Sequence, residues 1–313
     1  MHSMIELRGL HRYFGRTRAV CDVNFAVERG QVFGYIGPNG AGKTTSMRIL
    51  STLDQPTYGD ALVDGFSVVN DPDRVRRRLG FMPDYFGTYS NVNVREYLDF
   101  YARAYGLRGS ERTRALSYVM SFTKLDLLAE KPIDGLSKGM KQRLCLGRAL
   151  IHDPAVLVLD EPAAGLDPRA RIQLREMIRA LAAHGKTVLV SSHILTELAE
   201  MCDLVGIIER GRLLAVGSVA EIQRGQQSRQ ATRMQVRLLD DAAALANWLS
   251  QREGVDEIQT EGTSTTFHHL ADAAAEAALL RAMIEAGFRV VAYGSLTKTL
   301  EEVFMQVTEG HVQ

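Results

Sequence analysis

Apolar positions in the first two thirds of the chain form short runs or alternate with polar ones, which is typical of strands. These patterns predict strands at residues 4–7, 21–27, 32–36, 61–63, 79–82, 156–159, 188–190, 204–208 and 213–216. The runs at 156–159 and 188–190 are wholly apolar, as in central strands of a parallel sheet that is covered on both faces. The last two strands flank E-R-G-R and predict a hairpin.

Between these strands, residues 94–128 change to a helical pattern. Tyr97, Leu98, Tyr101 and Tyr105 lie close to helical spacing. The arginines of a short basic segment, Arg74, Arg76, Arg77 and Arg78, are interpreted as the solvated face of another helix.

A second unit is predicted after residue 223. Residues 224–233 are polar and patternless, so we interpret them as a linker between domains at 1–223 and 234–313. The later pattern predicts strands at 234–238, 265–270 and 289–291, and helices at 242–249 and 273–286. Leu300, Val303, Phe304 and Val307 follow an i, i+3, i+4, i+7 spacing and predict a closing helix.

A glycine-rich motif gives the first chemical assignment. Residues 37–45 read G-P-N-G-A-G-K-T-T after the apolar run at 32–36, which is the P-loop pattern in its strand–loop–helix context. Glycines let backbone N–H groups line a concave anion site, and the dipole of the following helix favours negative charge there. The expected ATP-binding residues are Gly37, Pro38, Asn39, Gly40, Ala41, Gly42, Lys43, Thr44 and Thr45. Lys43 can reach the β- and γ-phosphates, and the Thr44 hydroxyl can bind Mg²⁺. The chain is therefore expected to bind a nucleoside triphosphate.

Composition narrows the class of protein. The 313 residues are 46% apolar, and 37 Lys and Arg balance 37 Asp and Glu, which argues against a protein that coats nucleic acid. Cys21, Cys145 and Cys202 lie far apart and suggest buried thiols in a reducing compartment. The sequence shows neither a membrane-spanning apolar run nor the apolar core of a signal peptide, so a cytoplasmic location is expected.

A pair of carboxylates follows the apolar strand at 156–159. Strands of a parallel sheet end at one edge, so Asp160 and Glu161 are expected beside the P-loop. There, Asp160 can hold Mg²⁺ through water, and Glu161 can act as the general base for the attacking water. The alternative is a strand that simply ends in charged loop residues.

The segment 136–143 reads L-S-K-G-M-K-Q-R, and Ser137 is placed to cap a helix. Together with the preceding motifs it resembles the ATP-binding subunit of the ABC transporter family, whose signature begins L-S-G-G-Q. In that family the signature contacts the γ-phosphate of ATP held by the other subunit, and Ser137 and Gly139 match the phosphate-contacting positions. Lys138 and Met140 depart from the signature, which adds a positive charge and removes an amide.

The resemblance covers roughly residues 4–220 and implies roles for further residues. G-L-D-P at 165–168 is similar to the D-loop at the dimer interface, although Asp167 and Pro168 also fit an ordinary helix start. His193 resembles the switch histidine that contacts the γ-phosphate. Phe14 resembles the aromatic that stacks on adenine; Tyr13 is the alternative, and either could belong to the core.

Asp84 is a departure from the family, because most relatives have a glutamine there. An aspartate can still offer an oxygen to Mg²⁺, but it cannot donate the amide hydrogen bond. Our hypothesis is that Asp84 keeps metal binding and alters the coupling of hydrolysis to a partner.

His268 and His269 have no carboxylate or cysteine spacing that would suggest a metal site.

The resemblance implies an α/β P-loop NTPase core whose mixed sheet has a mostly parallel centre. An antiparallel β arm, a helical subdomain at about 84–150 and a small α+β C-terminal domain complete the expected fold. The implied function is ATP hydrolysis with Mg²⁺ by a homodimer that drives a separate integral membrane permease from the cytoplasmic face. Tyr85, Phe86 and Tyr89 are candidate docking aromatics or subdomain core, and the C-terminal unit resembles the extension of drug and antibiotic exporters.

Two other classes of protein fit the sequence less well than a transporter ATPase. Ribosome-acting relatives usually carry two ATPase units, and DNA-repair relatives carry long coiled coils or zinc motifs, whereas this chain has one P-loop and neither insertion. A P-loop kinase or GTPase is not supported, because the base-reading motif N-K-x-D is missing. No nucleic-acid partner is expected.

Overall fold

The computed structural model describes residues 3–85, 87, 91–194, 198–225, 232–270 and 273–296. The chain divides into two units, Met1–Val219 and Ala220–Gln313. Helix α8 (Val219–Gly225) contains the start of the predicted linker, and residues 226–231 lie outside the described part. The domain limits 1–223 and 234–313 stay a prediction.

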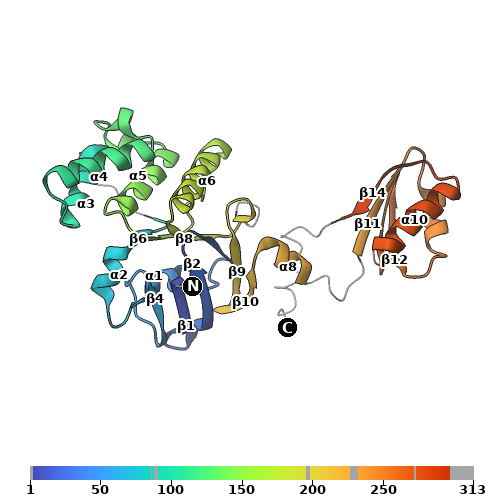
Figure 1. Ribbon diagram of the computed structural model, residues 1–313, viewed down its shortest axis with the longest axis horizontal. Coiled ribbons are helices and arrows are strands. Elements are labelled where there is room, and N and C mark those ends of the chain that lie inside the picture. The colour runs from blue at the N-terminus through green and yellow to red at the C-terminus, as the bar shows by residue number, and fades with distance from the viewer. Residues whose placement is uncertain are drawn as a thin grey trace. The chain divides into compact units, whose positions relative to one another are not determined.

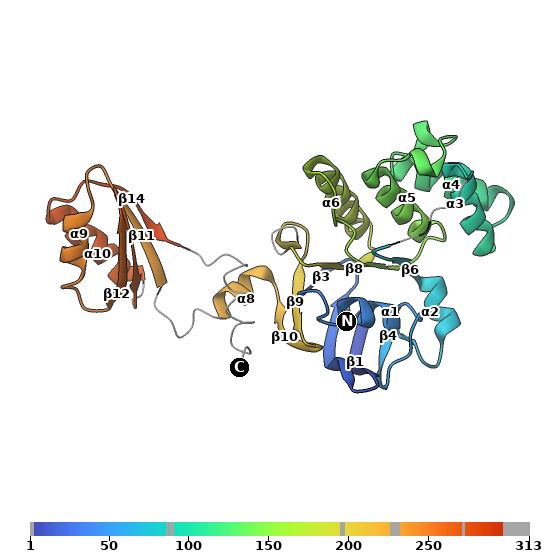
Figure 2. The same cartoon turned by 180° about the vertical axis from the view of Figure 1, so that it is seen from behind.

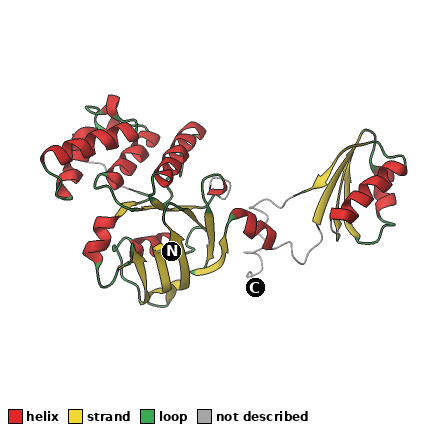
Figure 3. Cartoon of the chain, in the orientation of Figure 1, coloured by secondary structure: helices red, strands yellow, loops and turns green. Residues whose placement is uncertain are grey.

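The first unit is built on two sheets (Figures 1 and 3). The six-stranded sheet has the order β10-β9-β3-β8-β7-β6, and the four-stranded sheet has the order β2-β1-β4-β5. Their strands are β1 (Ser3–Phe14), β2 (Thr17–Glu28), β3 (Val32–Ile36), β4 (Tyr58–Val63), β5 (Phe66–Ser67), β6 (Leu79–Met82), β7 (Val156–Leu159), β8 (Thr187–Ser192), β9 (Leu204–Glu209) and β10 (Arg212–Gly217). The strands from β9 to β6 are parallel, and β10 pairs antiparallel with β9. The predicted hairpin and the mostly parallel centre are therefore confirmed.

Helices cover both faces of the six-stranded sheet (Figures 1 and 2). The helices and 3₁₀ turns of this unit, before α8, are α1 (Lys43–Leu50), α2 (Pro72–Arg78), α3 (Val94–Ala104), α4 (Gly109–Phe122), η1 (Asp126–Leu128), η2 (Ile133–Gly135), α5 (Lys138–Leu150) and α6 (Pro168–Ala183). On one side α1 joins the six-stranded sheet to the arm of β1, β2 and β4 through one apolar core. On the other side α5 and α6 lie against the sheet, and α3 and α4 extend the helical group.

Local sequence explains several helix boundaries. Asn93 and Glu96 form a capping box at the start of α3. The region predicted as helical at 94–128 breaks after α3, where Gly106 has a φ of 84°. The four arginines lie on α2 with exposed side chains, as predicted.

The second unit contains a four-stranded antiparallel sheet with the order β12-β13-β11-β14. Its elements are β11 (Thr232–Leu238), α9 (Ala243–Leu249), β12 (Val255–Glu261), β13 (Ser264–His269), α10 (Ala273–Glu285) and β14 (Val290–Ser295). Both helices lie on one face of the sheet (Figure 3), and the core between them includes Phe267, Leu245 and Met283. This confirms a small α+β C-terminal unit.

Some predictions need correction or lie outside the described residues. Strand β12 was missed because it is an edge strand whose exposed positions carry Asp256, Glu257 and Glu261, which are unfavourable strand formers. The predicted closing helix at 300–307 lies outside the described residues.

The three cysteines are buried free thiols, as predicted, and burial raises the pKa of Cys145 to about 11. Over the described ranges, no helix has the length and apolar character needed to cross a membrane.

Candidate functional site

Four strands of the first unit end at one edge of the six-stranded sheet. In the parallel register Ile36 of β3 lies opposite Ser192 of β8, and Leu159 of β7 lies opposite Met82 of β6. The residues that follow these strand ends therefore meet at the same edge, as the sequence predicts. These residues include the P-loop, Asp84, Asp160, Glu161 and His193.

The P-loop is shaped by glycines that leave no room for a side chain. A Cβ atom on Gly37 would lie 2.2 Å from the carbonyl oxygen of Ile208, and one on Gly42 would lie 2.4 Å from that of Ala19. Gly42 also has a φ of 106° and directly precedes α1, a conformation that other residues rarely adopt. The loop and the first turn of α1 therefore combine close backbone approach with a positive helix end, which suits a phosphate.

Lys43, the first residue of α1, is 5% exposed and points back over the loop. Its Nζ donates hydrogen bonds to the carbonyls of Gly37 at 2.7 Å and Pro38 at 3.3 Å. The same atom lies 3.5 Å from Oε1 of Glu161. The ammonium group is thus held between the phosphate loop and the catalytic candidate.

Asp160 is almost fully buried at the end of β7, with 1% of its surface exposed. Its Oδ1 accepts a hydrogen bond of 2.6 Å from the Ser191 hydroxyl. Burial raises the pKa of the Asp160 carboxyl, hydrogen bonds from Ser191 and Thr44 act in the opposite direction, and the charges of Glu161 and Asp84 raise it further. A buried carboxyl with acidic neighbours favours a bound cation.

A divalent cation fits the donor set around Asp160. The Thr44 hydroxyl is hydrogen-bonded to Asp160, and the Asp84 carboxylate is close enough for its charge to act on Asp160. All three groups offer oxygen atoms, which are the ligands that Mg²⁺ prefers, and Mg²⁺ in nucleotide sites is usually completed by water and phosphates.

Glu161 lies between two cationic or ionisable side chains. Its Oε2 is 2.8 Å from Nδ1 of His193, and its Oε1 is buried with Lys43 as its neighbour at 3.5 Å. Glu161 has a φ of 47°, a left-handed conformation that is costly for a residue other than glycine and concentrates at functional sites. Its backbone N–H donates to the Ser191 hydroxyl at 2.8 Å.

Ser191, to which no role was assigned from the sequence, connects both carboxylate residues. It is fully buried at the end of β8, donates to Asp160 and accepts from Glu161. A signal was present in the sequence, since Ser191 directly follows the apolar run at 188–190, which was predicted as a central strand of a covered parallel sheet.

Ser137 and Gly139 are not joined to this edge group by a hydrogen bond or ion pair of the described residues. Ser137 caps α5 by accepting from Met140 N–H at 3.3 Å. Both residues line a cleft of about 160 Å³ with Asp167, which caps α6 by accepting from Ala170 N–H at 2.8 Å. The helix-start interpretation of Asp167 and Pro168 is therefore confirmed.

Phe14 and Tyr13 differ in exposure at the end of β1. Phe14 is 48% exposed, and the Arg12 guanidinium lies 4.4 Å from the centre of its ring. Tyr13 is less exposed, and its hydroxyl is hydrogen-bonded to His11 Nδ1 at 2.9 Å within the arm. Of the two rings, Phe14 is therefore the more exposed.

Comparison with known protein families shows which family this chain belongs to. The model described as ABC transporter matches residues 20–164, and that described as ATP-binding protein DrrA1-3-like, C-terminal domain, matches residues 217–308. The chain is also 33% identical to an uncharacterized ABC transporter ATP-binding protein, YxlF of Bacillus subtilis, over 97% of this chain and 99% of that protein. The chain therefore belongs to the family of ABC transporter ATP-binding proteins.

Two other relatives share mainly the first unit. The probable multidrug ABC transporter ATP-binding protein YbhF of Escherichia coli is 39% identical over 71% of this chain, which spans 38% of YbhF's length. The Nod factor export ATP-binding protein I of Ralstonia nicotianae is 37% identical over 70% of this chain and 68% of that protein.

Solved structures confirm the fold of the first unit. An ATP-binding subunit of an ABC transporter aligns with a TM-score of 0.66 and 31% identity, covering 72% of this chain and 95% of that chain. The dimeric structure of MJ0796, a bacterial ABC transporter cassette, aligns with a TM-score of 0.63 and 25% identity over 69% of this chain and 99% of that chain. The predicted P-loop NTPase core with arm and helical subdomain is confirmed.

Proposed function

We propose that the protein hydrolyses ATP and supplies the energy for an ABC exporter. The observation that carries this proposal is the position of Glu161, with one carboxylate oxygen at His193 and the other near Lys43 of the P-loop. A general base, a phosphate-binding cation and a residue able to contact the γ-phosphate are the groups that ATP hydrolysis needs.

The proposed reaction uses the residues at the sheet edge in separate roles. The P-loop residues 37–45 and Lys43 bind the phosphates, and the exposed ring of Phe14 stacks on adenine. Thr44, Asp84 and Asp160 hold Mg²⁺, directly or through water, and Mg²⁺ when bound neutralises charge on the phosphates. Glu161 takes a proton from the attacking water, whose oxygen bonds to the γ-phosphorus as the bond to ADP breaks.

His193 orients Glu161 in this proposal. Its Nδ1 is occupied by the Glu161 carboxylate at 2.8 Å, which leaves Nε2 to contact the γ-phosphate. Ser191 holds the Glu161 backbone and the Asp160 side chain, so it fixes the base relative to the metal ligand.

A homodimer would complete the site. Ser137 and Gly139 lie at the start of α5 and are not joined to the P-loop of the same chain by a hydrogen bond or ion pair of the described residues. This supports their proposed contact with ATP held by a second copy, as the family resemblance implies. The dimeric form of the MJ0796 cassette supports the proposed homodimer.

The proposed partner is an integral membrane permease, which this protein would drive as a peripheral subunit at the cytoplasmic face of the membrane. The names of YbhF and of the Nod factor protein describe multidrug transport and export, which favours an exporter. Tyr85 beside Asp84 is 84% exposed and is a candidate contact with the permease; Phe86 and Tyr89 lie outside the described residues. Residues 1–223 would form the ATP-binding domain and 234–313 the C-terminal domain.

Substitution of the proposed base tests the function. Glu161→Gln should lower the rate of phosphate release about 10²- to 10⁴-fold, the usual contribution of a general base, while a fluorescent ATP analogue still binds. Glu130→Gln removes an exposed carboxylate that pairs with Arg95 and should leave the rate unchanged. Equal rates for the wild type and Glu161→Gln would contradict the assignment of the base.

The transport role needs a separate test. Tagged Glu161→Gln protein, which should remain in the ATP-bound dimer, is captured from detergent-solubilised native membranes and analysed by mass spectrometry. A stoichiometric membrane protein with several spans supports the permease. Recovery of ribosomal or DNA-bound proteins without a membrane protein would instead favour a soluble ATPase.

A further inference from the structure

The turn of the β9–β10 hairpin contacts the P-loop from outside the proposed phosphate site. This hairpin turn consists of Arg210 and Gly211, which lie between Glu209 at the end of β9 and Arg212 at the start of β10. The Gly211 N–H donates a hydrogen bond of 2.9 Å to the carbonyl of Ala41 in the P-loop. The P-loop backbone is therefore bonded directly to a turn that is distant in the sequence.

The hairpin turn is also bonded to the antiparallel arm. The Cys21 N–H of β2 donates a hydrogen bond of 2.7 Å to the Gly211 carbonyl, and β10 lies beside β2 (Figures 1 and 2). Gly211 thus uses its N–H on the P-loop and its carbonyl on β2. A single residue connects the arm with the P-loop.

The three backbone segments pack closely where they meet. A Cβ atom on Gly42 of the P-loop would lie 2.4 Å from the Ala19 carbonyl oxygen of β2, and a Cβ on Gly211 would lie 2.8 Å from the same oxygen. Gly211 also has a φ of 79°, which residues other than glycine rarely adopt. A side chain at Gly211 would therefore push the arm away from the P-loop.

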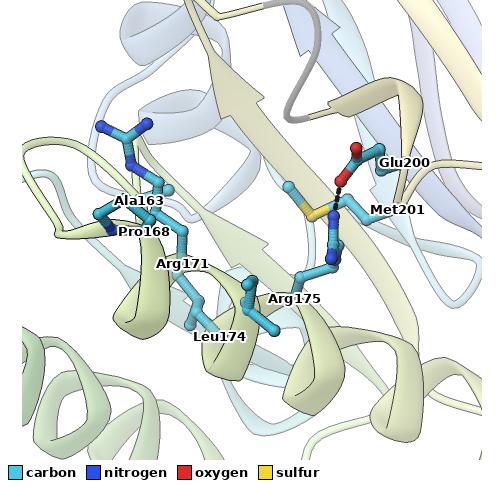
Figure 4. A pocket seen from close by; sticks show the side chains of 8 residues that line it. Ala163, Pro168, Arg171, Leu174, Arg175, Glu200 and Met201 are labelled. Atoms are coloured by element: carbon cyan, nitrogen blue, oxygen red, sulfur yellow. Dashed lines mark ion pairs between the residues drawn. The ribbon is translucent and has the colours of Figure 1, made fainter.

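The clefts of the first unit lie elsewhere and offer no room for such a side chain. The cleft of about 350 Å³ beside α6, which Figure 4 shows, is lined by Arg171, Leu174 and Arg175 among others, and by no residue of this contact. The same holds for the clefts of about 160 Å³ and 310 Å³. An atom added at Gly211 would have to displace backbone.

Strand β2 connects this contact with the proposed adenine site. In the register of β1 and β2, Thr17 lies opposite Phe14, and Val20 lies opposite Arg12. Cys21, whose N–H bonds the hairpin turn, directly follows Val20. A shift of β2 at Cys21 would therefore move Phe14 relative to the P-loop.

The Phe14 ring is itself fixed to the arm. The Arg12 guanidinium lies 4.4 Å from the centre of the ring and forms an ion pair of 2.8 Å with Asp54. The Arg12 side chain is 24% exposed and that of Asp54 is 19% exposed, so the pair is partly shielded from water. The ring should therefore follow the arm.

We propose that Gly211 is a positioning residue for ATP, which sets the distance between the P-loop and the Phe14 ring. The P-loop would take the triphosphate and Phe14 the adenine. Two linked groups bind tightly only where the geometry lets both sites be occupied at once. A ligand without a base needs the P-loop alone. The inference rests on the proposed function, in which both sites bind one ATP.

The test compares two ligands by calorimetric titration in the presence of Mg²⁺: the β,γ-imido analogue of ATP and inorganic tripolyphosphate. Gly211→Ala should weaken binding of the analogue about tenfold, because the added Cβ displaces the Ala19 carbonyl and the arm with it. Tripolyphosphate affinity should stay within about twofold, since it does not depend on Phe14.

A double variant gives a second measure with the ATP analogue alone. Phe14→Ala removes the proposed stacking and should weaken binding of the analogue. If Gly211 acts through the distance to Phe14, the variant Phe14→Ala/Gly211→Ala loses no more affinity than the weaker-binding single variant. Losses that multiply would show that the two residues act independently and would overturn the inference. This result decides even where tripolyphosphate binds too weakly to be measured.

Gly30→Ala is the matched control. Gly30 lies in the turn between β2 and β3 with a φ of 76°, and the nearest atom to its Cβ would be the Ala182 carbonyl oxygen at 3.6 Å. The change adds similar backbone strain without the short contact, so both affinities should stay at the wild-type value. Gly211→Asn adds the same Cβ with less strain, because asparagine adopts positive φ more readily, and replaces Gly211→Ala if that variant does not fold.

The outcomes separate this inference from the proposed function. A wild-type protein that binds neither ligand overturns the proposed function, and the role of Gly211 with it. If the wild type binds the analogue and folded Gly211→Ala binds it equally well, only the role of Gly211 is overturned. An equal loss of affinity for both ligands also overturns it, because the hairpin turn would then support the P-loop alone.

Discussion

The six-stranded sheet of the first unit and the four-stranded sheet of the second place their polar residues differently. Every residue of β3, β7 and β8 is buried, and polar groups gather after the strand ends. In β13 burial alternates with partial exposure along the strand, and its neighbour β12 carries several charged exposed residues. The first sheet is covered on both faces, whereas helices lie on one face of the second (Figure 3).

This difference explains where the chemistry is found. A parallel strand covered on both faces has no side on which a polar group meets water, so polar residues collect at the ends. Because all parallel strands end in the same direction, Lys43, Asp160 and His193 come together at one edge. An antiparallel sheet with one open face spreads its polar residues over that face, as Gln235 and Thr266 show by lying opposite each other in register.

The largest expected effect tests whether the two units fold separately. Phe267→Ala removes a fully buried ring from the C-terminal core and should destabilise that unit by about 3–5 kcal/mol. Calorimetry should show an earlier transition for the second unit only, with binding of a fluorescent ATP analogue unchanged. Loss of ATP binding in this variant would mean that the sheet edge depends on the second unit.

A pair of glycine substitutions sharpens the comparison between the sheets. Gly37→Ala places a Cβ 2.2 Å from the Ile208 carbonyl, whereas a Cβ on Gly294 of β14 would have no atom within 4 Å. Overpacking of this kind typically costs about 1–3 kcal/mol, so Gly37→Ala should weaken ATP binding by between about fivefold and about 150-fold. Gly294→Ala should change neither ATP binding nor thermal stability measurably. Unimpaired binding by Gly37→Ala would show that the P-loop backbone can shift to admit a methyl group.

The smallest effect concerns the hydroxyl that joins the carboxylates. Ser191→Ala removes the hydrogen bonds to Asp160 and from Glu161 and should cost about 1–2 kcal/mol of stability in the first unit. Phosphate release should fall further than ATP affinity, because the base is displaced while the P-loop is intact. Urea unfolding and steady-state kinetics measure the two effects.

Thr265→Val provides the control for Ser191→Ala. Thr265 is also a fully buried hydroxyl residue in a strand, and it lies 3.1 Å from the Thr260 hydroxyl in the C-terminal sheet. Its replacement should alter the stability of the second unit and leave phosphate release unchanged. If Ser191→Ala behaved in the same way, Ser191 would have no part in positioning Glu161.

Local patterns determined much of the molecule from the sequence alone. The apolar runs at 32–36, 79–82 and 156–159 coincide with β3, β6 and β7, because a short apolar run next to a polar turn specifies a covered strand. The P-loop glycines and the helix-capping residues Ser137 and Asp167 could also be recognised, since their effect depends on a few neighbouring residues.

Tertiary structure decided what depends on residues far apart in the chain. Ser191 meets Asp160 and Glu161 across 31 and 30 positions of sequence, and that contact exists only in the register between β7 and β8. The edge position of β12 and the ion pair between Arg175 and Glu200 likewise follow from which elements become neighbours. Side-chain periodicity specifies how one segment folds and which face it buries, but the partner of that face is selected by the packing of the whole unit.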